Sequence, residues 1–398
     1  MIAVRRGRAF LPVLALVASC WQSSGPSSPT VSPTAPSPRP VPGPTAPAGP
    51  SDPFVELASG WQHTCARRQS GTVLCWGNNG HGQLGNGTRE SSSRLVKVEG
   101  LADAVELAVG TDFSCARRQA GGVICWGNDE FGQLGGGRGT KPGVLSLRPT
   151  AVTGLRPAIQ LTAGEYHACA LEQGGTVQCW GDARNGQIGS DAKPAFGRPV
   201  PIEQLGPSTR IASGAAHVCA LEAAGRVKCW GRNTEGQLGD GKSGSRIKPV
   251  VVATIEDVVD LASGHHHVCA RLRSGGVWCW GSNASAQLGE NAGRDRKRGT
   301  PVEVPGLREP VVALAGGGEH TCARLQSGRA LCWGSNAAGQ LGQRSTIPTL
   351  PRPTAVRGMG DAVALALGLR HTCALRKNGE VLCVGSSELG TLGPYGPR

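Results

Sequence analysis

VELASGWQHTCARRQSGTVLCWGNNGHGQLGNG, residues 55–87, is the first of seven similar stretches that fill the chain from Val55 onward. Each stretch contains two cysteines separated by nine residues, and the first cysteines of successive pairs lie 50, 54, 50, 50, 53 and 51 residues apart. Self-similarity at a fixed period near 50 indicates one supersecondary unit stacked on copies of itself. We therefore expect the 398 residues to form one repeat array and not two or three ordinary domains.

The residues between the cysteines predict how each pair is placed. Residues 63–67 and 72–76 are strand-like runs, and a glycine follows the first cysteine by six positions in every unit. Glycine at the end of a three-residue hairpin loop adopts a left-handed conformation without steric cost. With Gly71 in that place, Cys65 lies opposite Cys75, at a spacing that a disulfide accepts. The predicted bonds are Cys65–Cys75, Cys115–Cys125, Cys169–Cys179, Cys219–Cys229, Cys269–Cys279, Cys322–Cys332 and Cys373–Cys383. The alternative is a cytosolic chain with fourteen free thiols.

A histidine stands two residues before the first cysteine in six units, whereas the second unit has Phe113 there. One His and two Cys per unit could bind zinc, but an obligatory ligand would not permit Phe113, and zinc usually takes closer ligand pairs. We expect each histidine to pack between units and to hydrogen-bond a neighbouring loop. We predict no metal site and no cofactor.

Two more motifs recur after the second cysteine. Trp-Gly follows it in six units, with Val384 in place of Trp in the seventh, and a Gly-Gln-Leu-Gly turn or a variant comes next. Trp at a fixed repeat position is expected to fill the core between neighbours, although a row that stacks on carbohydrate is an alternative. The glycines predict a tight turn anchored by the Leu. A strand resembling Pro-x-x-Val, as at 149–152, then leads into the next unit.

Together these motifs resemble the regulator-of-chromosome-condensation (RCC1) repeat family, from Val55 to Gly393. The resemblance implies an all-β fold, a single seven-bladed β-propeller with about four short antiparallel strands per blade, over residues 54–398. The paired cysteines depart from the eukaryotic pattern and look like a secreted bacterial branch. The seventh unit has no Pro-x-x-Val strand of its own, so residues 39–42 could complete the last blade, or it has three strands.

The amino terminus is similar to a bacterial lipoprotein signal. Arg5, Arg6 and Arg8 precede a short apolar stretch, and Val17-Ala18-Ser19-Cys20 follows. The similarity implies that residues 1–19 are removed and that Cys20 is lipidated, although an ordinary signal peptide with a coincidental cysteine is the alternative. Residues 20–53 are rich in Pro, Ser and Thr, so beyond Cys20 we expect a disordered tether. Trp21 after the cysteine favours the outer membrane of the cell envelope.

The sequence predicts a binding scaffold that is not an enzyme, because no catalytic constellation stands out from the repeats. The expected partner is an unidentified protein or other envelope macromolecule, the lipid attaches a monomer to the membrane, and nucleic acid is not expected. The formal charge of +13 favours acidic partners or simply a solvated surface. Loops of variable length suggest the binding face. A basic patch in one of them is the candidate site: Arg294, Arg296, Lys297 and Arg298.

The resemblance implies two alternative functions. The founding member of the family is a guanine-nucleotide exchange factor that regulates chromosome condensation, and a secreted member is an enzyme inhibitor that binds through aromatic and polar loops. Five Phe and two Tyr in this chain argue against the inhibitor.

Overall fold

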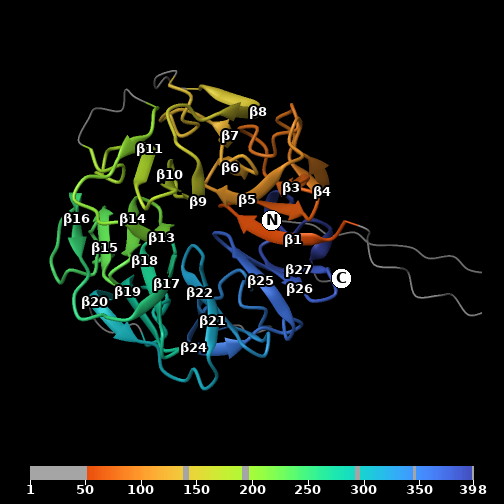
Figure 1. Cartoon of the computed structure of the whole chain (residues 1–398). Helices are drawn as coiled ribbons and strands as arrows, with labels where there is room; N and C mark the ends of the chain where they lie inside the picture. The colour runs from red at the N-terminus through yellow and green to blue at the C-terminus, as the bar shows by residue number, and fades with distance from the viewer. Residues whose placement is uncertain (1–51, 138–142, 191–196, 292–295, 344–346, 397–398) are drawn as a thin grey trace, which may run out of the picture. The chain divides into compact units, whose positions relative to one another are not determined.

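The computed structural model describes residues 52–137, 143–190, 197–291, 296–343 and 347–396. Seven antiparallel sheets are arranged as blades around a central axis, each sheet made of strands that are consecutive in the chain (Figure 1). Six blades have four strands and the seventh has three among the described residues. The chain is thus a seven-bladed β-propeller, as the repeat predicts.

Every blade begins at the axis and proceeds outward. The inner strands are β1 (Phe54–Ser59), β5 (Ala104–Val109), β9 (Ala158–Ala163), β13 (Ser208–Ser213), β17 (Val258–Ser263), β21 (Val311–Gly316) and β25 (Ala362–Leu367). The second strands are β2 (His63–Arg68), β6 (Phe113–Arg118), β10 (His167–Glu172), β14 (His217–Glu222), β18 (His267–Leu272), β22 (His320–Leu325) and β26 (His371–Arg376). The third strands are β3 (Val73–Gly77), β7 (Val123–Asn128), β11 (Val177–Gly181), β15 (Val227–Gly231), β19 (Val277–Ser282), β23 (Ala330–Ser335) and β27 (Val381–Gly385). The outer strands are β4 (Ser92–Lys97), β8 (Leu145–Ala151), β12 (Val200–Pro201), β16 (Arg246–Val251), β20 (Lys297–Glu303) and β24 (Thr349–Ala355).

The second and third strands form the hairpin that the cysteine spacing predicts. Cys65 pairs with Cys75 across β2 and β3, and Gly71 closes the loop at a φ of 88°. The same register recurs in all seven blades, each with a disulfide and a Cα–Cα distance of 4.1 Å. The predicted disulfides are confirmed, and none of them links two blades.

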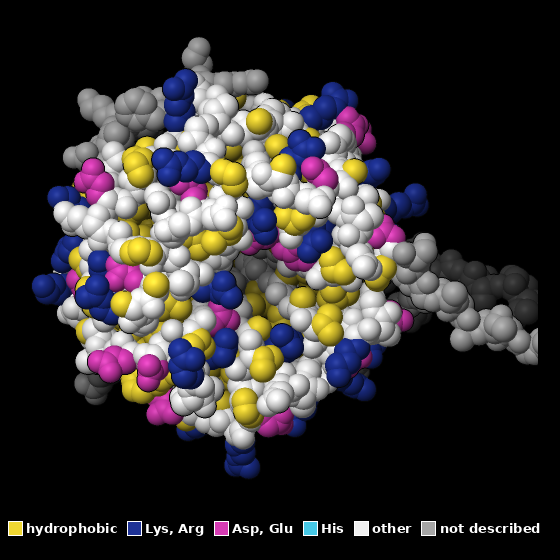
Figure 2. Space-filling view, viewed as in Figure 1, with side chains coloured by type: hydrophobic (Ala, Val, Ile, Leu, Met, Phe, Trp, Pro, Cys, Tyr) yellow, Lys and Arg dark blue, Asp and Glu magenta, His cyan; other side chains and the backbone are white. Residues whose placement is uncertain are grey.

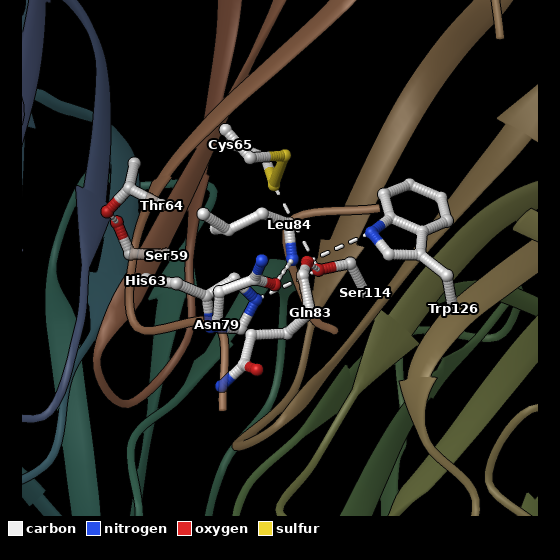
Figure 3. Close-up of a disulfide and its surroundings, with 10 residues drawn as sticks. Ser59, His63, Thr64, Cys65, Asn79, Gln83, Leu84, Ser114 and Trp126 are labelled. Carbon is white, nitrogen blue, oxygen red and sulfur yellow. Dashed lines mark hydrogen bonds between the residues drawn. A yellow bond between two sulfur atoms is a disulfide. The ribbon is translucent and has the colours of Figure 1, made fainter. Parts of the chain in front are cut away.

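Neighbouring blades are joined by a repeated cluster of side chains, shown for the first two blades in Figure 3. The backbone carbonyl of Gln83 in the Gly-Gln-Leu-Gly turn of the first blade accepts hydrogen bonds from Trp126 Nε1 and Ser114 Oγ of the second, both at 2.9 Å. Because Ser114 gives its proton to that carbonyl, it accepts the 2.8 Å hydrogen bond from His63 Nε2. Trp126 and His63 are fully buried. The histidine therefore packs between blades as expected, but its partner is a strand hydroxyl and not a loop.

The ring closes with the same kind of contact. Two 3₁₀ turns, η1 (Glu388–Gly390) and η2 (Gly393–Tyr395), follow β27 and contact β4 of the first blade. Trp76 Nε1 donates to the carbonyl of Thr391 at 3.1 Å, and the ring of Tyr395 lies edge-on to Trp76. The first and last blades are thus joined by the seventh copy of the turn. The 39–42 segment proposed for a fourth strand lies outside the described residues.

No helix among the described residues is long and apolar enough to cross a membrane.

Candidate binding site at the mouth of the central channel

Seven glycines surround the axis where each inner strand ends. They are Gly60, Gly110, Gly164, Gly214, Gly264, Gly317 and Gly368. A Cβ on Gly60 would lie 2.1 Å from the carbonyl oxygen of Gly110, and the same contact continues around the ring until Gly368 meets Gly60. Only glycine permits backbones to approach this closely, so these positions cannot take a larger side chain without a shift of the neighbouring backbone.

Two residues follow each of these glycines before the next strand. These seven pairs are Trp61-Gln62, Thr111-Asp112, Glu165-Tyr166, Ala215-Ala216, His265-His266, Gly318-Glu319 and Leu369-Arg370. Each pair adjoins the four residues that precede a Gly-Gln-Leu-Gly turn, as the hydrogen bond from Asn78 to Gln62 and that from Ser285 to Glu319 show. We call the pairs and these four-residue segments the mouth of the channel. The segments are 78–81, 128–131, 182–185, 232–235, 282–285, 335–338 and 386–389.

Backbone hydrogen bonds hold the mouth in place. The N–H of Glu165 donates to the carbonyl of Ala215, and the N–H of Ala215 donates to that of His265, both at 3.0 Å. Similar bonds link most of the other neighbouring pairs, and each channel glycine donates to the carbonyl three residues later, as Gly60 does to His63. Side chains at the mouth therefore project from a rigid base, which lowers the entropic cost of binding.

Aromatic side chains cross the mouth in a row. Phe131 lies 5.0 Å from Tyr166, and Trp61 lies 5.4 Å from His265, between ring centroids. Glu165 lies between the two pairs, next to Tyr166 in the chain and with its carboxylate 3.9 Å from His265 Nε2. We call these five residues the mouth row. Its members come from the first, second, third and fifth blades, so the row spans the channel opening, and all five are partly exposed.

Burial governs the protonation of the mouth row. It raises the pKa of the Glu165 carboxyl above its ordinary value, and with the nearby carboxylate it raises the pKa of Tyr166 to about 12. Burial and the neighbouring His266 lower the pKa of His265 to about 4. Burial also lowers the pKa of His266. Both histidines are therefore neutral at pH 7.

A pocket of about 340 Å³ opens beside Trp61. Trp61, His265 and Leu369 line it together with two charged side chains, those of Glu319 and Arg370, and with further polar residues, His266, Ser335 and Gln340. Trp61 Nε1, His265 Nε2 and His266 Nδ1 are buried, and none has a hydrogen-bond partner among the described residues. Trp61, Leu369 and two alanines give the pocket an apolar part, and its polar groups could fix the orientation of a ligand or of a partner's side chain.

The basic patch predicted from the sequence lies on the outer edge of the fifth blade, and two of its side chains reach the mouth segments 232–235 and 282–285. Arg298 forms an ion pair with Glu290 at 2.8 Å, and Lys297 Nζ donates to the carbonyl of Thr234 in the fourth blade. Arg296 donates to the carbonyl of Ala284. These three side chains are thus partly engaged by their own propeller. Arg294 and Cys20 lie outside the described residues, and no cluster of three His, Cys, Asp or Glu in the described part could hold a metal ion.

The sequence analysis missed the mouth row, although a signal was present. When the seven units are aligned, the channel glycine never changes, whereas the two following positions hold Trp, Thr, Glu, Ala, His, Gly and Leu, then Gln, Asp, Tyr, Ala, His, Glu and Arg. Most positions that pack between blades repeat one residue type, as the His in six units and the Trp in six units do. The two positions after each channel glycine vary from unit to unit, so packing between blades does not restrict their residue type. Such variable positions could have been proposed as the binding face.

Comparisons with known proteins agree with this fold. A family model described as the RCC1-like domain matches residues 22–291, and a model of the regulator of chromosome condensation (RCC1) repeat matches residues 274–324 and 327–375. Among curated proteins, the chain is 40% identical over 76 residues to Protein RCC2 homolog of Danio rerio and 30% identical over 147 residues to the probable E3 ubiquitin-protein ligase HERC6 of Homo sapiens. These matches cover 19% and 35% of this chain, but only 15% and 14% of those relatives.

Solved structures are similar over most of the chain. Human WBSCR16 superposes with a TM-score of 0.73 at 22% identity, over 82% of this chain and 88% of that one. Prp20p of Saccharomyces cerevisiae, described with its binding to Gsp1p and histones, gives 0.70 at 23% identity, over 79% and 80%. At this level of identity the likeness concerns the fold. With a family model that matches more than half of its residues and seven blades in its structure, the chain belongs to the RCC1-like domain family.

Proposed function

We propose that this protein is a binding scaffold of the cell envelope, attached to the membrane through a lipid on Cys20, and that it holds a partner protein at the channel mouth. The observation that carries the proposal is the mouth row, in which Trp61 and Tyr166 are presented on a rigid ring. Trp and Tyr are the residue types that most often dominate the energetics of protein interfaces. Binding of proteins by relatives such as Prp20p supports the same class of function.

Site-specific photo-cross-linking in source cells tests the mouth. A photo-reactive amino acid would replace Arg370, which is exposed beside the pocket, or Lys248, which is exposed on the outer strand β16. We expect a discrete protein adduct from position 370 that is lost when Trp61→Ala and Tyr166→Ala are added, and none from position 248. Equal adducts from both positions, or an adduct that survives the double substitution, would place binding elsewhere.

The lipid anchor has its own test. Metabolic labelling with palmitate should label the full-length protein, and Cys20→Ala should abolish the label and release the protein from the membrane fraction. An unlabelled wild-type protein would contradict the anchor and leave the proposal for the mouth unchanged.

The mouth row also favours enzyme inhibition as a second candidate. The small number of Phe and Tyr argued against an aromatic binding face, but Phe131 and Tyr166 lie together there with Trp61. Under this alternative, the partner cross-linked at position 370 would be an enzyme whose activity falls upon addition of the wild-type protein but not of the mouth variant.

A further inference from the structure

The charge of the propeller is unevenly distributed. The described residues of the outer strands and of the connections that lead into them carry 13 Lys and Arg against 6 Asp and Glu, over residues 86–99, 136–152, 190–203, 240–252, 290–304 and 343–357. Figure 2 shows many of the Lys and Arg side chains projecting from the outer edge of the ring. The positive charge of the chain thus belongs largely to its circumference.

The mouth has the opposite charge. Its pairs and four-residue segments contain eight Asp and Glu side chains against three Arg, a formal net charge of −5. Three cations of the outer connections, Arg89, Arg296 and Lys297, donate to carbonyls of these segments, and counting them leaves a net charge of −2. The pKa shifts of His265 and His266 keep both neutral, so they do not offset the carboxylates. Arg184 is paired with Asp182 by two hydrogen bonds, so these two groups neutralise each other and leave the net charge unchanged. A partner approaching along the axis therefore meets a negative opening inside a positive rim.

The mouth row also has faces that suit a cation. The guanidinium of Arg184 lies 4.4 Å from the ring centroid of Phe131, so the row already holds one cation against an aromatic face. Trp61 lies at the other end of the row, and the pocket beside it includes the exposed carboxylate of Glu319. An aromatic face with carboxylates nearby attracts a guanidinium or ammonium group through its ring quadrupole and through the carboxylate charge.

We propose that the mouth receives a basic protein loop, with a Lys or Arg side chain of the partner placed against Trp61 and between the carboxylates of Glu165 and Glu319. This inference deepens the proposed function and rests on the mouth being the binding face. It predicts a partner whose interacting surface is positively charged, although the protein itself is basic overall. The positive rim would disfavour binding of such a partner at the circumference, and this adds specificity to the attraction at the mouth.

The test is selection of disulfide-constrained seven-residue loops, displayed on phage, against the immobilised full-length protein. Loops that also bind the Trp61→Ala, Tyr166→Ala variant are discarded, so that the remaining loops depend on the mouth. We expect these loops to be enriched in Lys and Arg. The Glu165→Gln, Glu319→Gln variant should bind them at least tenfold more weakly, with a smaller dependence on salt concentration.

A matched variant, Glu90→Gln, Glu303→Gln, removes two exposed carboxylates near and on the outer strands and should change affinity less than twofold. Mouth-dependent loops that are neutral or acidic would overturn the basic partner while leaving the mouth as the binding face. Failure to obtain any mouth-dependent loop would overturn both the basic partner and the mouth. Circular dichroism of each variant distinguishes lost binding from lost folding.

Discussion

Trp126 and Trp61 occupy different regions of the same ring, one in the joint between the first two blades and the other at the channel mouth. Trp126 is fully buried and donates to the Gln83 carbonyl, and five other blades have an equivalent indole, four of them bonded to the Gln of the preceding turn. Trp61 is partly exposed, its Nε1 has no partner among the described residues, and it has no counterpart in the other six pairs. Residues that repeat stabilise the ring, whereas residues that do not repeat are available for recognition.

The channel glycines offer the strongest test of the repeated region. In Gly60→Ala the new Cβ would meet the Gly110 carbonyl oxygen at 2.1 Å, and no flexible side chain can relieve a backbone contact of this kind. We expect a loss of about 4 kcal/mol or more, or failure to fold, measured by guanidinium denaturation. Gly122→Ala is the control, since a Cβ there meets nothing within 4 Å. Equal stability of the two variants would show that the ring of glycines does not constrain the fold.

Substitution of each tryptophan separates the structural role of Trp126 from the binding role of Trp61. Trp126→Ala removes a buried indole and one hydrogen bond, and should reduce the free energy of unfolding by about 3–5 kcal/mol. Trp61→Ala should cost about 1 kcal/mol or less, because the side chain is partly exposed, yet it should abolish the cross-link at position 370. If Trp61→Ala destabilises the protein as much as Trp126→Ala, the mouth row belongs to the structural core. Trp278→Ala, at another partly buried Trp, controls for the loss of a large side chain.

The histidines buried between blades make the stability of the propeller depend on pH. Burial lowers the pKa of His63 to about 3 and that of His371 to about 4, while the unfolded values stay near 6.5. A lowered folded-state pKa means that the unfolded chain binds more protons below pH 6.5. Stability is therefore fully present above that pH and is lost as the pH falls toward 3.

The joint between the second and third blades has no titrating histidine at this position. There Phe113 faces Ala168 of the next blade, in place of the His63–Ser114 pair. His63→Phe with Ser114→Ala should reproduce that joint and reduce the slope of stability against pH by up to about 1.4 kcal/mol per pH unit between pH 6 and 4. Denaturation midpoints measured across that range give the slope. An unchanged slope would show that His63 is not buried in its neutral form.

The repeated parts of the blades could be predicted from the sequence, whereas the non-repeating residues of the mouth could not. The spacing of Cys65, Gly71 and Cys75 sufficed for the hairpin register, because a two-strand pairing is fixed locally by its loop. The number of blades followed from counting units. The mouth row could not be derived in this way, since Trp61, Glu165 and His265 are about 100 residues apart in sequence and meet only because the ring closes. The basic patch was chosen for its charge in sequence, whereas the structure pairs Arg298 with Glu290.

The disulfides have a consequence for oxidative folding. Fourteen cysteines can pair in on the order of 10⁵ ways, yet each native bond joins residues ten positions apart within one hairpin. A loop of this length closes in roughly 10–100 ns, far faster than contacts between distant units form. Each hairpin can therefore be oxidised independently of the others, before contacts between distant units form. The order of the repeats in the chain thus directs correct pairing without any need to sort bonds between blades.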